Sequence, residues 1–187
     1  MGAGMLLRRF AAAPLIAPAA LLAVLPLPKS LFYRDRRPTR LGRVVNRLWT
    51  RMAAAGLTPN SWPGEPKGGT IALETAGRRS GRRRLNVVTW VEYDGERYLV
   101  SMLGERVDWV RNVRAAQGEA AIRHGDRRAI RLDEVPVSQR GPIVQAYLKR
   151  TARATKGHLG LEPDAPLEAF DLIVPNHPVF RIVELDA

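Results

Sequence analysis

Five short runs of residues with high β-propensity dominate the middle of the chain. They span residues 70–76, 85–93, 97–103, 120–124 and 127–135 and are rich in Val, Ile, Leu, Tyr and Trp. Asp94-Gly95 and Gly125-Asp126 lie between runs, where tight hairpin turns belong. A last run, 178–185, ends the series. Closure removes exposed edges from an antiparallel sheet of five or six strands, so the pattern predicts an α+β fold built on a small closed barrel.

Three segments with helical character accompany these strands. Between residues 41 and 52, apolar residues recur at intervals of three and four, with arginines on the opposite face, and Gly56 ends the pattern. A short helix is predicted at 107–116. Ser138 is placed to cap a further helix that runs to about Lys149. The face of that helix expected to be buried carries Ile143, Val144, Tyr147 and Leu148. These helices are expected to cover the sheet.

The amino-terminal region leaves three alternatives open. Residues 10–28 are uncharged, with basic residues on both sides, and contain Pro14, Pro18, Pro26 and Pro28. Proline removes backbone donors and breaks a helix, so a straight membrane-spanning helix is not expected. The stretch is a segment that docks on a membrane surface or on the protein itself, a disordered segment, or an anchor or export signal. The expected organisation is an apolar, Pro-rich segment at 1–39 followed by one domain at 40–187.

Net charge and composition limit the classes of partner. Lys and Arg number 30 against 18 Asp and Glu, so the net charge is +12, which favours phosphates, polycarboxylates or an anionic membrane surface. Aromatic residues make up only 6% and none interrupts the basic turn described next, so no nucleic-acid partner is expected. The chain has no Cys, and its three histidines lie in separate segments. No metal site is therefore expected.

The densest positive charge lies between the first two predicted strands. Arg78, Arg79, Arg82, Arg83 and Arg84 surround Ser80 and Gly81. Five guanidinium groups at one turn repel one another, and a multiply charged anion relieves that repulsion by accepting their N–H groups. The turn therefore predicts an anion-binding site. A solvated charged face is the alternative interpretation.

Two motifs in this region resemble the deazaflavin-dependent nitroreductase family. The first is residues 73–81, LETAGRRSG, followed by Arg84, and the second is residues 108–115, DWVRNVRA. Members of this family are actinobacterial proteins that use coenzyme F-420, an 8-hydroxy-5-deazaflavin carrying a phosphate and an oligoglutamate tail. The resemblance covers residues 70–131, about a third of the chain. It implies a split β-barrel of the FMN-binding type, with residues 40–187 as a single deazaflavin-binding domain.

The resemblance also implies which residues form the coenzyme site. Those expected to hold the phosphate and the anionic tail are Arg78, Arg79, Ser80 and Arg84. A strand expected to lie along the cofactor carries Leu85, Asn86, Val87, Val88 and Thr89, and a second strand, facing the ring, carries Ser101, Met102, Leu103 and Gly104. A short helix whose amino end suits an anion carries Trp109, Val110, Arg111 and Asn112. The residues alone leave an alternative to coenzyme contact at two of these positions. Trp109 is then a core aromatic, and Asn112 is a capping or backbone-pairing residue.

The activity implied by the resemblance is hydride transfer from the reduced deazaflavin to a hydrophobic electrophile, which is a quinone, a nitro compound or an unsaturated lipid. Such a reduction also needs a proton from water or a side chain. Some family members carry tyrosine at the position of Val110 and lysine at that of Gly104, and neither group is present here. Tyr147, Ser101 and Arg111 are conceivable donors or orienting groups, but no spacing selects among them, so no catalytic residue is assigned.

A noncatalytic alternative is a carrier that binds the deazaflavin or a lipid at the membrane surface. The expected partner is a small hydrophobic acceptor, with peripheral membrane contact as a further expectation and the oligomeric state left open. The expected location is cytoplasmic, with the inner face of the plasma membrane as the alternative.

Overall fold

The computed structural model describes residues 33–34, 37–57, 68–155 and 160–185. The uncharged Pro-rich stretch at 10–28 lies outside the described residues, so the three alternatives for it stay predictions. The chain divides into two compact units, Met1–Trp49 and Thr50–Ala187, and each is described by itself. The expected domain boundary after residue 39 also stays a prediction.

The described part of the first unit contains two short strands and most of a helix. Strands β1 (Tyr33–Arg34) and β2 (Arg37–Pro38) pair antiparallel, and helix α2 spans Arg40–Ala54. The Gly42 N–H donates to Thr39 Oγ1 at 3.0 Å, so Thr39 caps the first turn of α2. Gly56, at φ +74°, follows the helix and ends it, as predicted. None of the helices in the described residues combines the length and apolar character that crossing a bilayer requires.

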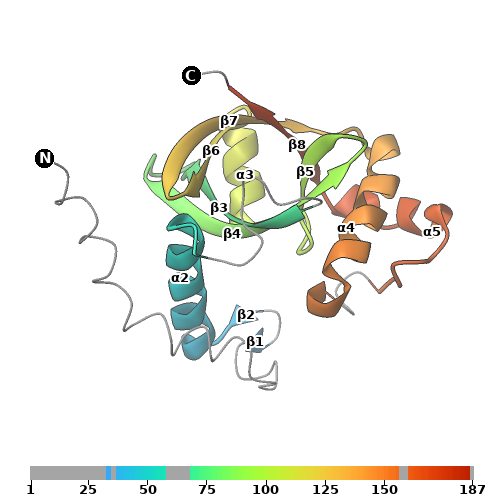
Figure 1. Cartoon of the computed structure of the whole chain (residues 1–187), viewed down its shortest axis with the longest axis horizontal. Coiled ribbons are helices and arrows are strands. Elements are labelled where there is room, and N and C mark those ends of the chain that lie inside the picture. The colour runs from blue at the N-terminus through green and yellow to red at the C-terminus, as the bar shows by residue number, and fades with distance from the viewer. Residues whose placement is uncertain (1–32, 35–36, 58–67, 156–159, 186–187) are drawn as a thin grey trace, which may run out of the picture. The chain divides into compact units, whose positions relative to one another are not determined.

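A closed antiparallel barrel forms the body of the second unit (Figure 1). Its strands are β3 (Gly68–Ala76), β4 (Arg83–Tyr93), β5 (Glu96–Val100), β6 (Glu119–His124), β7 (Asp126–Glu134) and β8 (Val179–Glu184). Their order around the barrel is β3-β4-β5-β8-β7-β6, and β6 closes onto β3. Asp94 and Gly95, at φ 51° and 74°, form the tight β4–β5 turn, because this hairpin type needs positive φ at both central residues. The predicted α+β barrel of antiparallel strands with covering helices is confirmed.

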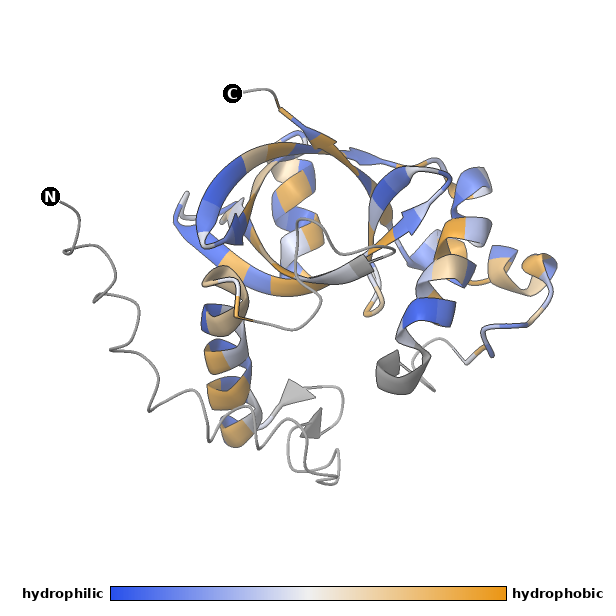
Figure 2. Cartoon of the chain, in the orientation of Figure 1, coloured by the Kyte–Doolittle hydropathy of each residue, from blue (hydrophilic) through white to orange (hydrophobic). Residues whose placement is uncertain are grey.

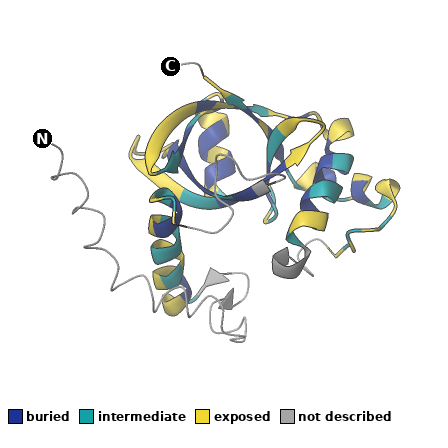
Figure 3. Ribbon diagram, in the orientation of Figure 1, coloured by how far each residue is buried: buried dark blue, intermediate teal, exposed yellow. Residues whose placement is uncertain are grey.

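Helix α3 (Asp108–Ala115) packs its apolar face into the barrel core. Trp109 meets the ring of Phe180 edge-to-face, with centroids 5.5 Å apart, and Val110 and Val113 are completely or almost completely buried. Hydrophobic segments alternate with hydrophilic ones along the helix and the strands in Figure 2, and Figure 3 shows the matching alternation of burial. Full burial of each such side chain contributes about 1.5–3 kcal/mol, so α3 is held firmly at the barrel.

A second apolar cluster joins the outside of the barrel to two helices. Helices α4 (Arg140–Thr155) and α5 (Leu167–Asp171) lie together on one side of the barrel, beside β5, in Figure 1. The predicted apolar face of α4 is buried: Ile143, Val144, Tyr147 and Leu148 pack in one cluster with Val91 of β4, Val179 of β8 and Phe170 of α5. This cluster fixes the position of β4, which carries part of the expected coenzyme site.

The predicted capping role of Ser138 is wrong. Ser138 lies inside a 3₁₀ turn, η3 (Val137–Gln139), and α4 begins two residues later at Arg140 and continues to Thr155. The Gln139 N–H bonds back to the Pro136 carbonyl at 3.0 Å, and this bond closes the tighter turn. A further 3₁₀ turn, η4 (Val174–Asn176), leads into β8.

Candidate functional site

The turn between β3 and β4 places the arginine cluster at one end of the barrel. The Gly77 N–H donates to the Arg82 carbonyl at 2.9 Å, and the N–H groups of Ser80 and Gly81 donate to the Gly77 carbonyl at 3.0 and 2.7 Å. Gly81 adopts φ +63°, which favours glycine. A side chain at Gly77 would meet both the Arg82 carbonyl and Ser80 Oγ at 3.2 Å. Glycines at both ends thus permit the compact turn that gathers the guanidinium groups.

Asn112 of α3 anchors this turn to the barrel. The residue is 3% exposed; its Oδ1 accepts the Arg78 N–H at 3.2 Å and its Nδ2 donates to Thr75 Oγ1 at 3.3 Å. The sequence left two structural roles open for Asn112, helix capping and backbone pairing, and the structure shows backbone pairing with Arg78. A contact between Asn112 and a coenzyme stays a prediction.

Arg78 is oriented by α3 and still offers donors. Its Nη1 donates to Asp108 Oδ1 at 2.8 Å and to Asn112 Oδ1 at 3.2 Å. Its Nε and Nη2 groups have no partner among the residues that the structure describes. Asp108 therefore fixes the direction of the guanidinium, although the sequence alone does not connect Asp108 with the turn. No local signal indicates this pair, because the two residues are 30 positions apart.

Arg79, Arg82 and Arg84 are exposed, and within the described residues none of them has an ion-pair partner. The backbone N–H of Arg79 likewise lacks an acceptor among those residues. Ser80 Oγ accepts a long bond, 3.4 Å, from the Arg82 N–H. Unpaired guanidinium groups and a free backbone N–H at one turn form a donor set that fits a phosphate or a carboxylate.

The expected strand at 85–89 lies within β4 and presents alternate residues to opposite faces. Val88 belongs to the barrel core together with Trp90. Leu85 is exposed, whereas Val87 and Thr89 are half-buried on the other face. Asn86 shares its direction with Val88 and is also half-buried. One ligand lying on the outer face can thus contact about half of this strand, namely Leu85, Val87 and Thr89.

Tyr147 of α4 lies against that outer face. Its hydroxyl is hydrogen-bonded to Thr89, and the residue is 5% exposed. Burial raises the pKa of Tyr147 to about 12, and the hydrogen bond with Thr89 opposes the shift. The phenol therefore keeps its proton throughout the physiological pH range.

The expected second strand at 101–104 is wrong as secondary structure. Strand β5 ends at Val100, and the next residues form a tight turn. Ser101 Oγ donates to the Gly104 carbonyl at 2.6 Å, the Gly104 N–H donates to the Ser101 carbonyl at 3.2 Å, and Gly104 has φ +85°. A serine that bonds to nearby backbone competes with the sheet ladder and ends the strand. Within the turn, Ser101 is buried, Met102 and Gly104 are half-buried, and Leu103 is exposed.

His177 braces this turn from the carboxyl-terminal segment. Its Nδ1 lies 3.0 Å from the Ser101 carbonyl oxygen, which can only accept, so Nδ1 carries the proton. The Ser101 N–H donates to the Pro178 carbonyl at 2.9 Å. No local sequence signal indicates this role for His177, because the pairing crosses 76 positions.

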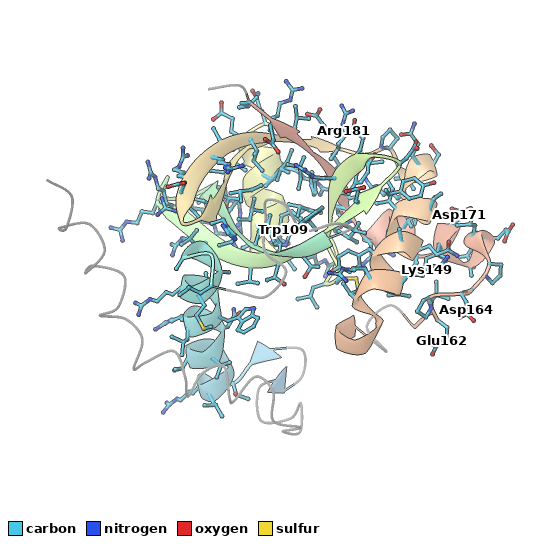
Figure 4. The ribbon with its side chains drawn as sticks, viewed as in Figure 1. Trp109, Lys149, Glu162, Asp164, Asp171 and Arg181 are labelled. Atoms are coloured by element: carbon cyan, nitrogen blue, oxygen red, sulfur yellow. The ribbon has the colours of Figure 1, made fainter. Side chains whose placement is uncertain are left out.

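The remaining expected helix residues divide between core and surface. Figure 4 shows Trp109 within the ring of strands, and Trp109 and Val110 are both buried in the barrel core, so the core role of Trp109 is confirmed. Arg111 is exposed. The α3 amino end carries Asp108 in its first turn and has no side-chain cap. Across the described ranges, no three His, Asp or Glu side chains gather closely enough to hold a metal ion.

Comparisons with known proteins identify the family. Residues 43–141, just over half of the chain, match the model of the F420H(2)-dependent quinone reductase family. No curated protein sequence matches the chain.

Several solved structures are similar at low identity. One is a protein of unknown function from Agrobacterium tumefaciens, 17% identical over 74% of this chain and 55% of that one, with a TM-score of 0.45. Another is a conserved hypothetical protein from Mycobacterium tuberculosis, 16% identical over 63% of this chain and 73% of that one, with a TM-score of 0.45. A third, described as an F420 reductase, is 18% identical over 63% of this chain and 86% of that one, with a TM-score of 0.38.

The family match confirms the expected coenzyme and the expected class of oxidoreductase. The nitro-reducing branch of the resemblance and its actinobacterial origin stay predictions. The chain belongs to the F420H(2)-dependent quinone reductase family, an oxidoreductase family that depends on reduced coenzyme F-420.

Proposed function

We propose that this protein passes a hydride from reduced coenzyme F-420 to a hydrophobic electrophile, with a quinone as the leading acceptor and nitro compounds or unsaturated lipids as alternatives. The observation that carries the proposal is the β3–β4 turn. There, Arg79, Arg82 and Arg84 lack partners within the described residues, while Arg78 is held in a fixed direction by Asp108. The family match supplies the coenzyme class.

The turn is proposed to bind the phosphate and the anionic tail of the coenzyme. Arg78 Nε and Nη2, the Arg79 N–H and the free guanidinium groups are the donors, and Ser80 lies among them. Each charge-assisted bond contributes about 1.5–3 kcal/mol net, so three or four of them provide roughly micromolar affinity. Because Asn112 holds the backbone at Arg78 and Asp108 orients the Arg78 guanidinium, Arg78 loses little side-chain entropy on binding, whereas Arg79, Arg82 and Arg84 must still be ordered by the ligand.

The outer face of β4, with Leu85, Val87 and Thr89, is proposed to carry the ring of the coenzyme, next to the turn at 101–104. The bound coenzyme supplies the hydride, and the chain positions the acceptor and allows a proton to reach it. Tyr147 holds a proton beside Thr89 and water is the other source; the proposal assigns the step to neither.

Peripheral membrane contact remains part of the proposal. On α2, Leu41 and Val44 are exposed, Val44 at 60%, and Arg43 and Arg47 are exposed on the same helix. An amphipathic helix with exposed apolar and cationic residues suits an anionic bilayer surface. Sedimentation with anionic and with neutral vesicles tests this part, and equal recovery in both pellets would remove the electrostatic argument.

Spectral titration tests the main proposal. The purified protein should bind coenzyme F-420 at roughly micromolar concentration and should bind FMN and NADPH at least about tenfold more weakly. Menadione should then oxidise the bound reduced coenzyme with turnover. Tight binding without oxidation by any quinone or nitro acceptor would overturn the proposed reaction and favour a carrier. A preference for FMN would overturn the coenzyme assignment.

A further inference from the structure

The barrel wall opens between β3 and β6. Their ladder contains three Cα pairs and ends at Glu74 and Ala121. Beyond that point, Thr75 and Ala76 continue to pair with β4, whereas Glu119 and Ala120 pair with β7. The two strands therefore diverge although each remains part of the sheet.

A cavity of about 330 Å³ lies at this opening. Residues from both diverging strands line it, together with residues from β7, the turn after β3 and the first residue of β4, Arg83. Its apolar wall includes Ala76, Ala120, Ala129 and Leu185, whereas the side chain of Ile130, which also borders it, belongs to the barrel core. The volume lies at the lower end of the range typical of small-molecule sites, about 300–1,000 Å³. The opening is thus large enough for a small organic molecule.

Glu74 brings a buried carboxylate to this cavity. Its side chain is 8% exposed, and its Oε1 lies 2.9 Å from Arg127 Nε and 3.7 Å from Arg83 Nε. Its Oε2 accepts no hydrogen bond from the residues that the structure describes. Oε2 is not among the fully buried side-chain atoms that lack a partner, so it is open to the cavity, and a ligand N–H group can bond to it there.

The charges that line the cavity balance. Glu74 and Glu119 are the acidic groups, and Arg83 and Arg127 are the basic ones. Each arginine meets Glu74 through Nε, so its terminal nitrogens keep donors for a further acceptor. The Glu119 carboxylate has no ion-pair partner in the described part of the chain. A simple anion would meet two carboxylates here and a simple cation two guanidinium groups, so a ligand with one charge of each sign fits best.

We propose that the opening between β3 and β6 binds a small zwitterion, an α-amino acid with a short aliphatic side chain. The ligand carboxylate accepts from the terminal nitrogens of Arg83 and Arg127. Its ammonium group donates to Glu74 Oε2 and to Glu119, and its side chain packs on the alanines and Leu185. This site lies on β3, β6 and β7 and adjoins the β3–β4 turn through Gly81 and Arg83, whereas the donors proposed for the coenzyme are Arg78, Arg79, Arg82 and Arg84.

The test is an amide NMR titration of the full-length, ¹⁵N-labelled protein without coenzyme. L-leucine should shift the amides of Ala76, Ala120 and Ala129 saturably. N-acetyl-L-leucine removes the positive charge and L-leucinamide removes the negative one, so each should bind at least about tenfold more weakly, equivalent to about 1.4 kcal/mol. No saturable shift with leucine at about 1 mM, or equal shifts with all three compounds, would overturn the proposal.

Substitutions localise the site. Arg127→Gln removes a group that donates hydrogen bonds to the ligand carboxylate, and Ala129→Leu fills the cavity without changing charge. Each should weaken leucine binding at least about tenfold. Arg128→Gln is the matched control, because Arg128 is the next residue on β7, is exposed and does not line the cavity. Equal effects of Arg127→Gln and Arg128→Gln would overturn the assignment. Should Arg127→Gln unfold the protein, Ala129→Leu still decides the question. A coenzyme titration of the same samples reports separately on the proposed function.

Discussion

The arginines at the β3–β4 turn and those at the junction of β7 with α4 occupy opposite chemical situations. At the junction, Arg140 is 5% exposed and bonds the Val135 carbonyl at 2.8 Å, the Val174 carbonyl at 3.2 Å and Glu134 at 3.0 Å. Arg114 joins Glu134 through two bonds of 2.8 and 2.9 Å. At the turn, Arg79 and Arg84 are exposed and, within the described residues, have no such partners.

The difference separates two uses of one residue type. A guanidinium with every neighbour satisfied holds β7, α3 and α4 in register and has few donors left for a ligand. A guanidinium without partners adds repulsion to the folded state and keeps its donors available. Pairing, rather than the number of arginines, therefore distinguishes Arg140 and Arg114 from Arg79, Arg82 and Arg84, while Arg78 and Arg83 at the same turn are paired with Asp108 and Glu74.

Arg140→Ala tests the paired arginines and should give the largest loss of stability. Removing a buried guanidinium strands two carbonyls and leaves Glu134 with Arg114 alone, at a cost of about 3–5 kcal/mol in the free energy of unfolding. Denaturant melts measure this cost, with Arg79→Ala as the control of the same chemistry at an unpaired site. Equal stability of the two variants would contradict the structural role of Arg140.

Asn112→Ala tests whether the turn needs its anchor. The substitution leaves the Arg78 N–H and Thr75 Oγ1 without a partner, so we expect about 1–3 kcal/mol of destabilisation. Coenzyme affinity should fall as well, because the turn loses its fixed position. Fluorescence titration and thermal melts provide the two readings. A loss of stability with unchanged affinity would show that the turn keeps its geometry without α3.

Arg79→Ala combined with Arg84→Ala tests the arginines without partners and should affect binding rather than stability. We expect at least about tenfold weaker coenzyme binding, about 1.4 kcal/mol, with no loss of melting temperature, because neither side chain has a partner to lose within the described residues. Arg106→Ala together with Arg128→Ala is the charge-matched control, since both residues are exposed and neither belongs to the expected site. Unchanged affinity in the turn variant would remove the turn from the coenzyme site.

The smallest expected effect is a pH dependence at the junction. The hydrogen bond from Arg114 holds the pKa of Glu134 below its ordinary value of 4.5, while burial opposes the shift. A depressed folded pKa stabilises the protein above the ordinary value, and that stability is lost as pH falls through the lowered one. Urea melts between about pH 6 and about pH 3 should show a shallower acid loss in Glu134→Gln than in the parent protein. Identical slopes would argue against the pair.

The barrel itself could be predicted because its signals are local. Runs rich in Val, Ile, Leu, Tyr and Trp indicate the strands, and Asp94-Gly95 specifies a hairpin through the positive φ of both residues. The end of β5 could not be predicted. Apolar residues continue past Val100 through Leu103, but Ser101 bonds to Gly104 and His177 binds the Ser101 carbonyl from the far end of the chain. The start of α4 was misplaced for a similar reason, since Arg140 is held by Val174, 34 positions away.

The candidate site likewise has one part that can be predicted from the sequence and one that cannot. The arginine cluster and the glycines that allow its turn are visible as sequence neighbours, so the presence of an anion-binding turn is predictable. Which guanidinium groups of the turn are ion-paired depends on carboxylates brought close by barrel closure: Asp108 for Arg78, and Glu74 for Arg83.

The strand runs, the hairpin positions and the place of the dense positive charge follow from the sequence alone, because β-propensity and turn geometry act over a few residues. The tertiary structure alone decided which charges are paired and where the wall opens between β3 and β6. Electrostatic pairing and strand divergence depend on distances between segments far apart in the chain, and those distances exist only once the barrel has closed.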